Sequence, residues 1–370
     1  MTTILRTTTA AQFLALLPAM LGCTPTRSLV LVPFAHSRSV GAMRVDLADD
    51  GQVDQLASTC IGMVCRLADV DELTAVVYTD QPLRSGDDEP AHARLAQALA
   101  QRADACGLHL RDALCVAADA WGSYLDPECP PAGHDLAELV PDARAPVPPG
   151  DQHSGVELPE VAAEAIAQTA TALEGLDAAV AAIRFGDATP GPARIDPRAL
   201  VAACRLDDMP ALFEEALGQD PADLDAFTAA LLVWTLSRPA TRDVALIQWS
   251  DDQDAGDAAL QAQLDWEDGA EYPPDLGERM WGDGARPDPD RLRAALELTR
   301  HVAARAPAAR RAGPLSMCGW LAWALGRSTH AAGYAQSALE CEPGHGLAEI
   351  VLSLTAAGHL PAWAFTAATP

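Results

Sequence analysis

A change of pattern near residue 126 constrains the fold of this chain more than any other feature of its sequence. Before that point, short and continuously apolar runs, such as residues 28–34 and 73–78, alternate with amphipathic helical segments. After residue 159 the apolar spacing is helical and no convincing strand follows. Alternation of this kind is typical of an α/β layer, in which helices connect the strands of a sheet. The pattern therefore predicts an α/β domain followed by an all-α domain.

The first part shows seven predicted elements in the order α-β-β-α-β-α-β. Helical spacing in residues 10–21 favours a buried amphipathic helix over an export signal. The remaining elements are predicted at residues 28–34, 40–47, 53–67, 73–78, 90–106 and 108–118. Because helices separate most of the strands, we predict a small and mostly parallel sheet for residues 1–126.

Prolines crowd residues 127–159, which we interpret as a linker or an irregular loop. Residues 160–370 form the predicted helical domain, which contains an acidic insertion at residues 251–290. Four helices joined by short turns are predicted at its end, at residues 290–306, 314–325, 329–340 and 347–357. Their pairing resembles tetratricopeptide-type helical hairpins, although the full repeat signature is not present.

The composition excludes several mechanisms. All 25 basic residues are arginine, and without lysine there is no P-loop, no pyridoxal-phosphate Schiff base and no kinase strand lysine. A formal net charge of −27 argues against general nucleic-acid binding and against attachment to an anionic membrane. The nine cysteines are scattered without a CxxC pair, and HExxH does not occur. We therefore predict a cytoplasmic protein with no metal site and no cofactor.

Polar residues follow two of the predicted strands and form a candidate ligand crevice. Ligands of open parallel sheets bind beyond the carboxyl ends of the strands. An arginine there could clamp an anion, and a carboxylate could act as a base. An alternative is that polar residues simply populate these loops. The candidate residues, from the loops at 79–88 and 119–124, are Asp80, Arg84, Asp119, Trp121, Ser123 and Tyr124.

A second set of residues carries a family resemblance. It opens with Gly22, Thr24, Pro25 and Ser28, continues with Arg44 and Asp46, and includes Trp121, Ser123, Tyr124, Arg242 and Asp243. These motifs resemble the domain-of-unknown-function family numbered 4192, found in GC-rich bacterial and phage genomes. The resemblance covers residues 8–361 and implies a cytoplasmic protein with no activity to inherit. Two residues apart on one strand, Arg44 and Asp46 suit either a functional pair or a structural salt bridge.

These observations predict a non-enzymatic interaction or scaffold protein. Its helical hairpins would offer the binding surface, and its partner would be another protein or a second copy of the chain. One alternative is a small-molecule or nucleotide binder, or a hydrolase, that uses the crevice at the strand ends. A further alternative, which rests on the genomes in which the family occurs, is a phage or host-defence accessory protein.

Overall fold

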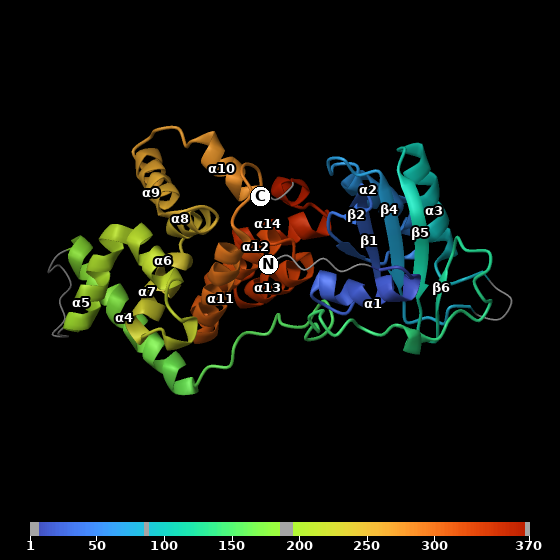
Figure 1. Ribbon diagram of the computed structural model, residues 1–370. Coiled ribbons are helices and arrows are strands. Elements are labelled where there is room, and N and C mark those ends of the chain that lie inside the picture. The colour runs from blue at the N-terminus through green and yellow to red at the C-terminus, as the bar shows by residue number, and fades with distance from the viewer. Residues whose placement is uncertain (1–6, 85–88, 186–194, 367–370) are drawn as a thin grey trace. The chain divides into compact units, whose positions relative to one another are not determined.

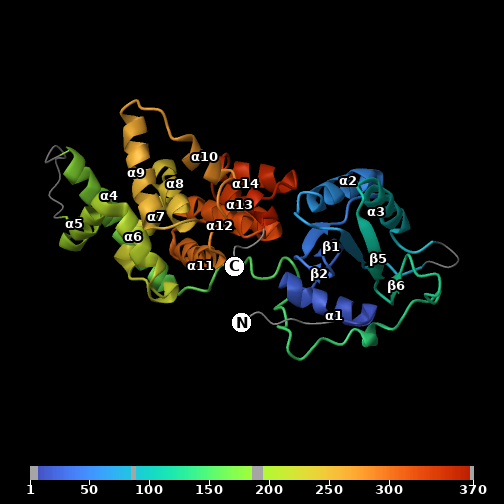
Figure 2. The same cartoon turned by 45° about the horizontal axis from the view of Figure 1, so that its top comes forward.

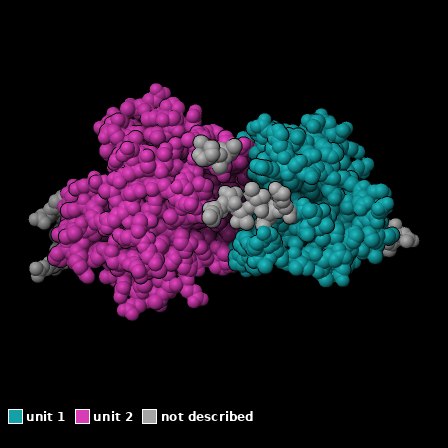
Figure 3. Space-filling model, in the orientation of Figure 1, with its two compact units in different colours: residues 1–154 teal, residues 155–370 magenta. Residues whose placement is uncertain are grey.

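The computed structural model of the protein describes residues 7–84, 89–185 and 195–366. The chain divides into two compact units, unit 1 at residues 1–154 and unit 2 at residues 155–370 (Figures 1 and 3). Most of the proline-rich segment, residues 127–154, therefore clusters with the α/β part. Residues 155–159 belong to the helical part.

Unit 1 is a mixed sheet with helices on its two faces. Its strands follow the order β2-β1-β4-β5-β6, and β3 pairs with β1. The elements are α1 (Ala10–Leu21), β1 (Ser28–Ala35), β2 (Arg38–Ser39), β3 (Met43–Asp46), α2 (Val53–Val64), β4 (Glu72–Tyr78), α3 (Ala93–Ala105), β5 (His109–Val116) and β6 (Trp121–Ser123).

The prediction of a mostly parallel sheet is wrong. Among the described strands, β4 and β5 form the parallel pair, whereas β1 is antiparallel to β2, β3 and β4, and β6 is antiparallel to β5. The reason is the tight return after β1, which reverses the chain and forces antiparallel pairing. The helix α2 then carries the chain from β3 to β4 across β1. Two strands that the sequence pattern did not predict, β2 and β6, are only two and three residues long.

Alternation along β1 separates two apolar cores. Leu29 and Leu31 pack with α2 and α3 on one face of the sheet. Val30 and Val32 pack with Leu14 and Leu17 of α1 on the other face. Figure 2 shows α2 and α3 on one side of the strands and α1 on the opposite side. A strand covered on both faces has a continuously apolar sequence, which explains the run in β1.

Unit 2 is helical throughout its described elements. They are α4 (Ala163–Phe185), α5 (Pro197–Cys204), α6 (Met209–Leu217), α7 (Ala226–Leu236), α8 (Pro239–Trp249), α9 (Gln253–Glu267), α10 (Pro274–Met280), α11 (Pro289–Arg305), α12 (Ala312–Ala324), α13 (Ser328–Cys341) and α14 (Gly346–Ala356). The acidic insertion predicted at residues 251–290 thus contains the long helix α9 and the short helix α10. None of the helices in the described ranges has the length and apolar character that a membrane span needs.

Two helices form the centre of unit 2. Every residue of α12 is buried, and α7 is buried from Thr228 to Leu236. A helix that is apolar on all sides has to be surrounded by other helices, which is their position here. Trp320 and Trp323 of α12 are buried together with Trp363, so these tryptophans belong to the core.

Candidate functional site

The loops that follow β4 and β5 lie together at one end of the sheet. The backbone N–H of Leu83 donates to Asp119 Oδ1 over 2.8 Å, and that of Ala118 donates to the carbonyl of Gln81 over 3.0 Å. Residues 85–88 of the candidate crevice lie outside the described residues. Because Asp119 accepts this backbone bond, its carboxylate helps to fix the loop after β4.

The six crevice residues do not share one cavity wall. Asp80, Arg84 and Asp119 are exposed. Trp121 is buried on the face that α1 covers, where its ring stacks on His134 with 4.3 Å between the ring centroids. Tyr124 packs on the opposite face, against the core beneath α2 and α3. The sheet itself therefore separates Trp121 from Tyr124.

Ser123 and Tyr124 are both committed to hydrogen bonds within unit 1. Ser123 Oγ donates to Asp112 Oδ1 over 2.7 Å and accepts the backbone N–H groups of Leu125 and Asp126. The hydroxyl of Tyr124 donates to the carbonyl of Ala91 over 2.6 Å. Burial raises the pKa of Tyr124 above its usual range, which disfavours the phenolate that a base would need. These contacts stabilise the strand ends, and they engage both hydroxyl groups that could otherwise take part in catalysis.

The opening family motif fastens the turn between α1 and β1. Gly22 ends α1 in the left-handed conformation with φ +71°, which glycine adopts without a Cβ penalty. Thr24 donates its backbone N–H to the carbonyl of Gly150 over 2.7 Å, and Pro25 is buried. The motif thus holds the end of α1 against a segment more than 120 residues further along the chain.

Ser28, Arg44 and Asp46 meet on neighbouring strands. The register places Ser28 opposite Asp46, and Arg44 donates to Ser28 Oγ over 3.0 Å and to Asp46 Oδ1 over 2.5 Å. The Arg44 side chain is 12% exposed and Asp46 is 70% exposed, so the arginine is sheltered and its partner is solvated. This is the geometry of a salt bridge at a sheet edge.

Gln152 completes the motif region, although no sequence pattern indicated it. Its Oε1 accepts both the backbone N–H and the hydroxyl of Thr26, and its Nε2 donates to the Thr26 carbonyl over 3.0 Å. All three bonds hold one residue of the turn that precedes β1. A glutamine 126 positions away, inside a proline-rich segment, carries no local signal of this contact.

Arg242 and Asp243 lie in the first half of α8. Arg242 Nε donates to Asp243 Oδ1 over 2.8 Å, and the Arg242 side chain is 11% exposed. Burial lowers the pKa of His345, and the charge of Arg242 lowers it further. The guanidinium of Arg242 therefore disfavours the protonated imidazole of His345, next to the start of α14.

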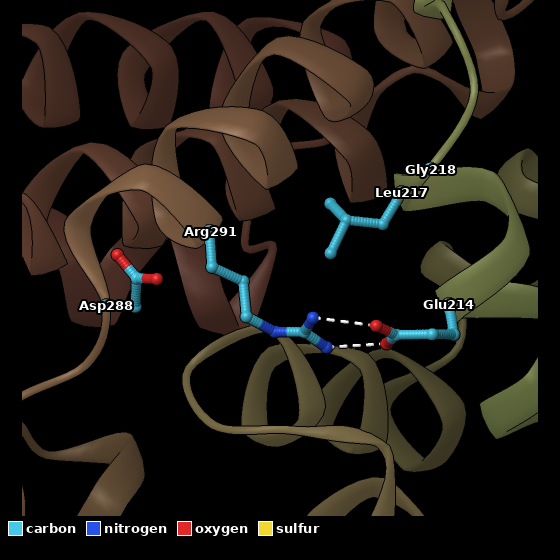
Figure 4. A pocket seen from close by; sticks show the side chains of 5 residues that line it. All are labelled: Glu214, Leu217, Gly218, Asp288 and Arg291. Carbon is cyan, nitrogen blue, oxygen red and sulfur yellow. Dashed lines mark hydrogen bonds and ion pairs between the residues drawn. The ribbon is translucent and has the colours of Figure 1, made fainter.

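A pocket of about 370 Å³ in unit 2 contains a bidentate ion pair (Figure 4). Arg291 of α11 donates to both carboxylate oxygens of Glu214 in α6, over 2.7 and 2.5 Å. The same guanidinium donates to the backbone carbonyl of Gln248. The side-chain amide of Gln248 in turn donates to Glu214 over 3.0 Å. These contacts join α6, α8 and α11 by polar interactions beside the pocket. Its lining residues are Glu214, Leu217, Gly218, Asp288 and Arg291.

We expect the stabilisation by this ion pair to disappear in acid. The hydrogen bonds from Arg291 lower the pKa of Glu214 below its usual value, so the pair stabilises the folded state above the pKa of an unfolded glutamate and loses that effect as the pH falls through the lowered value. Glu214→Gln should cost about 1 kcal/mol at pH 7, since the carboxylate is partly solvated, and much less near pH 3. Urea unfolding at both pH values measures this. The exposed Glu174→Gln serves as control, and an equal cost for Glu214→Gln at both pH values would contradict the assignment.

A short segment at the start of unit 2 lies across the C-terminal helices. We call it the strap: Gly155, Val156, Glu157 and Leu158. Val156 and Leu158 pack against the helical core, whereas Gly155 and Glu157 are exposed. Such alternation is typical of an extended segment that packs one of its two faces against the rest of the protein.

Residues of α11 and α13 hold the strap; we call this surface the strap groove, formed by Arg300, His330, Gly333 and Tyr334. Arg300 donates to the carbonyl of Glu157 over 2.7 Å. The hydroxyl of Tyr334 donates to the carbonyl of Gly155 over 3.4 Å. A Cβ at Gly333 would lie 3.0 Å from Val156 Cγ1, so the absence of a side chain there makes room for the strap. This contact was not predicted, because the crowded prolines of residues 127–159 favour a linker.

Across the described part of the chain, no group of three or more His, Cys, Asp or Glu side chains is placed to hold a metal ion. Comparison with curated proteins and with solved structures found no match. A family model does match, that of the Domain of unknown function (DUF4192), over residues 11–362. The match spans almost the whole chain, including both units and the motif residues from Gly22 to Asp243. The protein belongs to the DUF4192 family.

Proposed function

We propose that this protein is a non-catalytic interaction protein whose helical unit binds partner proteins. The observation that supports this best is the strap, a stretch of main chain held in a groove by side chains of two helices. Arg300 and Tyr334 both bind carbonyl oxygens, which every peptide offers at each residue. A groove that binds main chain in this way suits the recognition of polypeptide segments.

The arrangement of α11 to α14 favours the same function. Successive helices pack as neighbours, and Ala331, Ala335 and Ala338 keep α13 narrow where it meets α12. We compare α11 to α14 with the stacked hairpins of tetratricopeptide proteins, which bury one set of side chains and offer the others as a continuous surface. We expect that surface to be the place where partners bind.

A reducing compartment suits this proposal. All nine cysteines of the chain are free thiols in the structure, and Cys60 and Cys318 are buried. Burial raises the pKa of the Cys60 thiol to about 12, so this thiol stays protonated and unreactive at neutral pH. We accordingly expect the protein to act in the cytoplasm.

Filling the strap groove tests the proposal. Gly333→Leu places a side chain where Val156 now packs, whereas Gly277→Leu in α10 adds one where nothing lies within 4 Å. Proteins captured from a lysate of the source organism on the immobilised wild type would be identified, purified and titrated against each variant by surface plasmon resonance. We expect Gly333→Leu to weaken binding at least tenfold and Gly277→Leu to leave it unchanged. Equal affinity for the wild type and both variants would overturn the proposal.

A further inference from the structure

The strap makes contacts of two kinds with its groove. Its carbonyls at Gly155 and Glu157 accept bonds from Tyr334 and Arg300, and these bonds are independent of the strap's sequence. Its side chains at Val156 and Leu158, two residues apart, pack against the helical core. The first kind of contact fixes the main chain, and the second selects which peptides fit.

The groove side of the interface is preorganised. Arg300 is held by Glu297 of its own helix over 2.7 Å, and Tyr334 is 1% exposed with the strap in place. The bond from Arg300 to Glu297 does not involve the strap, so it orients this donor in advance and reduces the conformational entropy that binding costs. The strap has few bonds of its own, among them one from the backbone N–H of Gly155 to Glu157 Oε2 over 3.1 Å.

Resting on the proposed function, we propose that the strap is an intramolecular occupant of a peptide-binding groove. The ligand class is then an outstretched partner segment with apolar side chains two residues apart, like Val156 and Leu158, which displaces the strap. A tethered occupant competes at an effective concentration near the millimolar range, so the wild-type groove is largely closed to weak ligands. Release of the strap makes the groove accessible to the partner segment.

A labelled copy of the strap tests this directly. The probe is a fluorescein-labelled peptide of residues 153–161, followed by anisotropy with the full-length protein. The strap variant Val156→Ser with Leu158→Ser should bind the peptide at least tenfold more tightly than the wild type. Adding Gly333→Leu to that variant should abolish binding, and a peptide with serine at both apolar positions should not bind. Absence of binding to the strap variant, or equal binding of the serine peptide, would overturn the inference.

A second measurement does not depend on a variant that folds. In the wild-type protein, hydrogen exchange at residues 155–158 should become faster when the labelled peptide is added in excess, because the tethered copy leaves the groove. If the peptide binds while hydrogen exchange at residues 155–158 is unchanged, the peptide occupies another site, and this result would also overturn the inference. If the captured partner is lost with Gly333→Leu while this peptide fails to bind, the proposed function stands and the ligand class is wrong. If the peptide binds but the captured partner is insensitive to Gly333→Leu, the ligand class stands and the proposed function is wrong.

Discussion

Replacing Trp323 with alanine will lower the free energy of unfolding by about 3–5 kcal/mol. The side chain is fully buried and packs against the rings of Trp320 and Trp363, with centroids 6.1 and 6.4 Å away. Its indole N–H donates to the carbonyl of His359 over 2.8 Å, so the substitution also leaves a sheltered acceptor without a partner. Urea unfolding of the full chain, monitored by circular dichroism at 222 nm, measures the loss.

The matched control is Trp266→Ala in α9, because that side chain is 54% exposed. Its replacement should change the free energy of unfolding by less than about 1 kcal/mol, as is usual for surface sites. If the two variants were equally destabilised, the tryptophans of α12 would not be the centre of the helical core.

Alanine at Gly313 should destabilise the protein by about 3 kcal/mol, an unusually large effect for a single added methyl group. A Cβ there would lie 2.6 Å from the carbonyl oxygen of Leu236 and 2.7 Å from the Cα of Ser237. Both are backbone atoms at the end of α7, so no side chain can rotate away and α12 would have to move. The thermal midpoint and the urea midpoint of the variant should both fall.

Gly277→Ala provides the contrast for that variant. This glycine lies in α10, and nothing lies within 4 Å of the position that a Cβ would take. The same substitution should here be neutral or stabilising by up to about 1 kcal/mol, because alanine favours the helical conformation. A similar loss at both positions would show that Gly313 is not constrained by its distance from α7.

Local patterns predicted the elements of the helical end well. The helix predicted at residues 290–306 is α11 at Pro289–Arg305, and the one at 329–340 is α13 at Ser328–Cys341. Each has a buried stripe and a polar stripe, so its periodicity is visible within a single window of sequence. The apolar runs of β1 and β4 were visible for a similar reason, because both of their faces are buried.

Pairings between distant segments were not predictable in the same way. The strand register, the three bonds from Gln152 to Thr26 and the bond from Arg300 to Glu157 join residues far apart in the chain, 143 positions in the last case. None of these contacts imposes a periodic pattern on its neighbourhood. The candidate crevice failed to form one wall because side chains alternate along extended chain, and Trp121 and Tyr124, three positions apart at the unpredicted strand β6, face opposite cores.

Arginine is the only strongly basic side chain in this protein, and several of its guanidinium groups make contacts that depend on their planar geometry. Several guanidinium groups donate to backbone carbonyls distant in sequence: Arg305 to Ala222 and Leu224, Arg300 to Glu157, and Arg291 to Gln248. A planar group with five N–H donors can bind an ion-pair partner and a carbonyl at once, as Arg291 does with Glu214 and Gln248. A single lysine ammonium would not reproduce that geometry.

The short outer strands of unit 1 bear on how the protein behaves at high concentration. On one side of the sheet β1 is flanked by β2 and β3, with two and four residues, and on the other side β5 is flanked by β6, with three. Long and flat outer strands present rows of unpaired N–H and C=O groups that template aggregation. These outer strands are too short to present such rows, so we expect the native sheet to resist the edge-to-edge growth from which amyloid-like fibres arise.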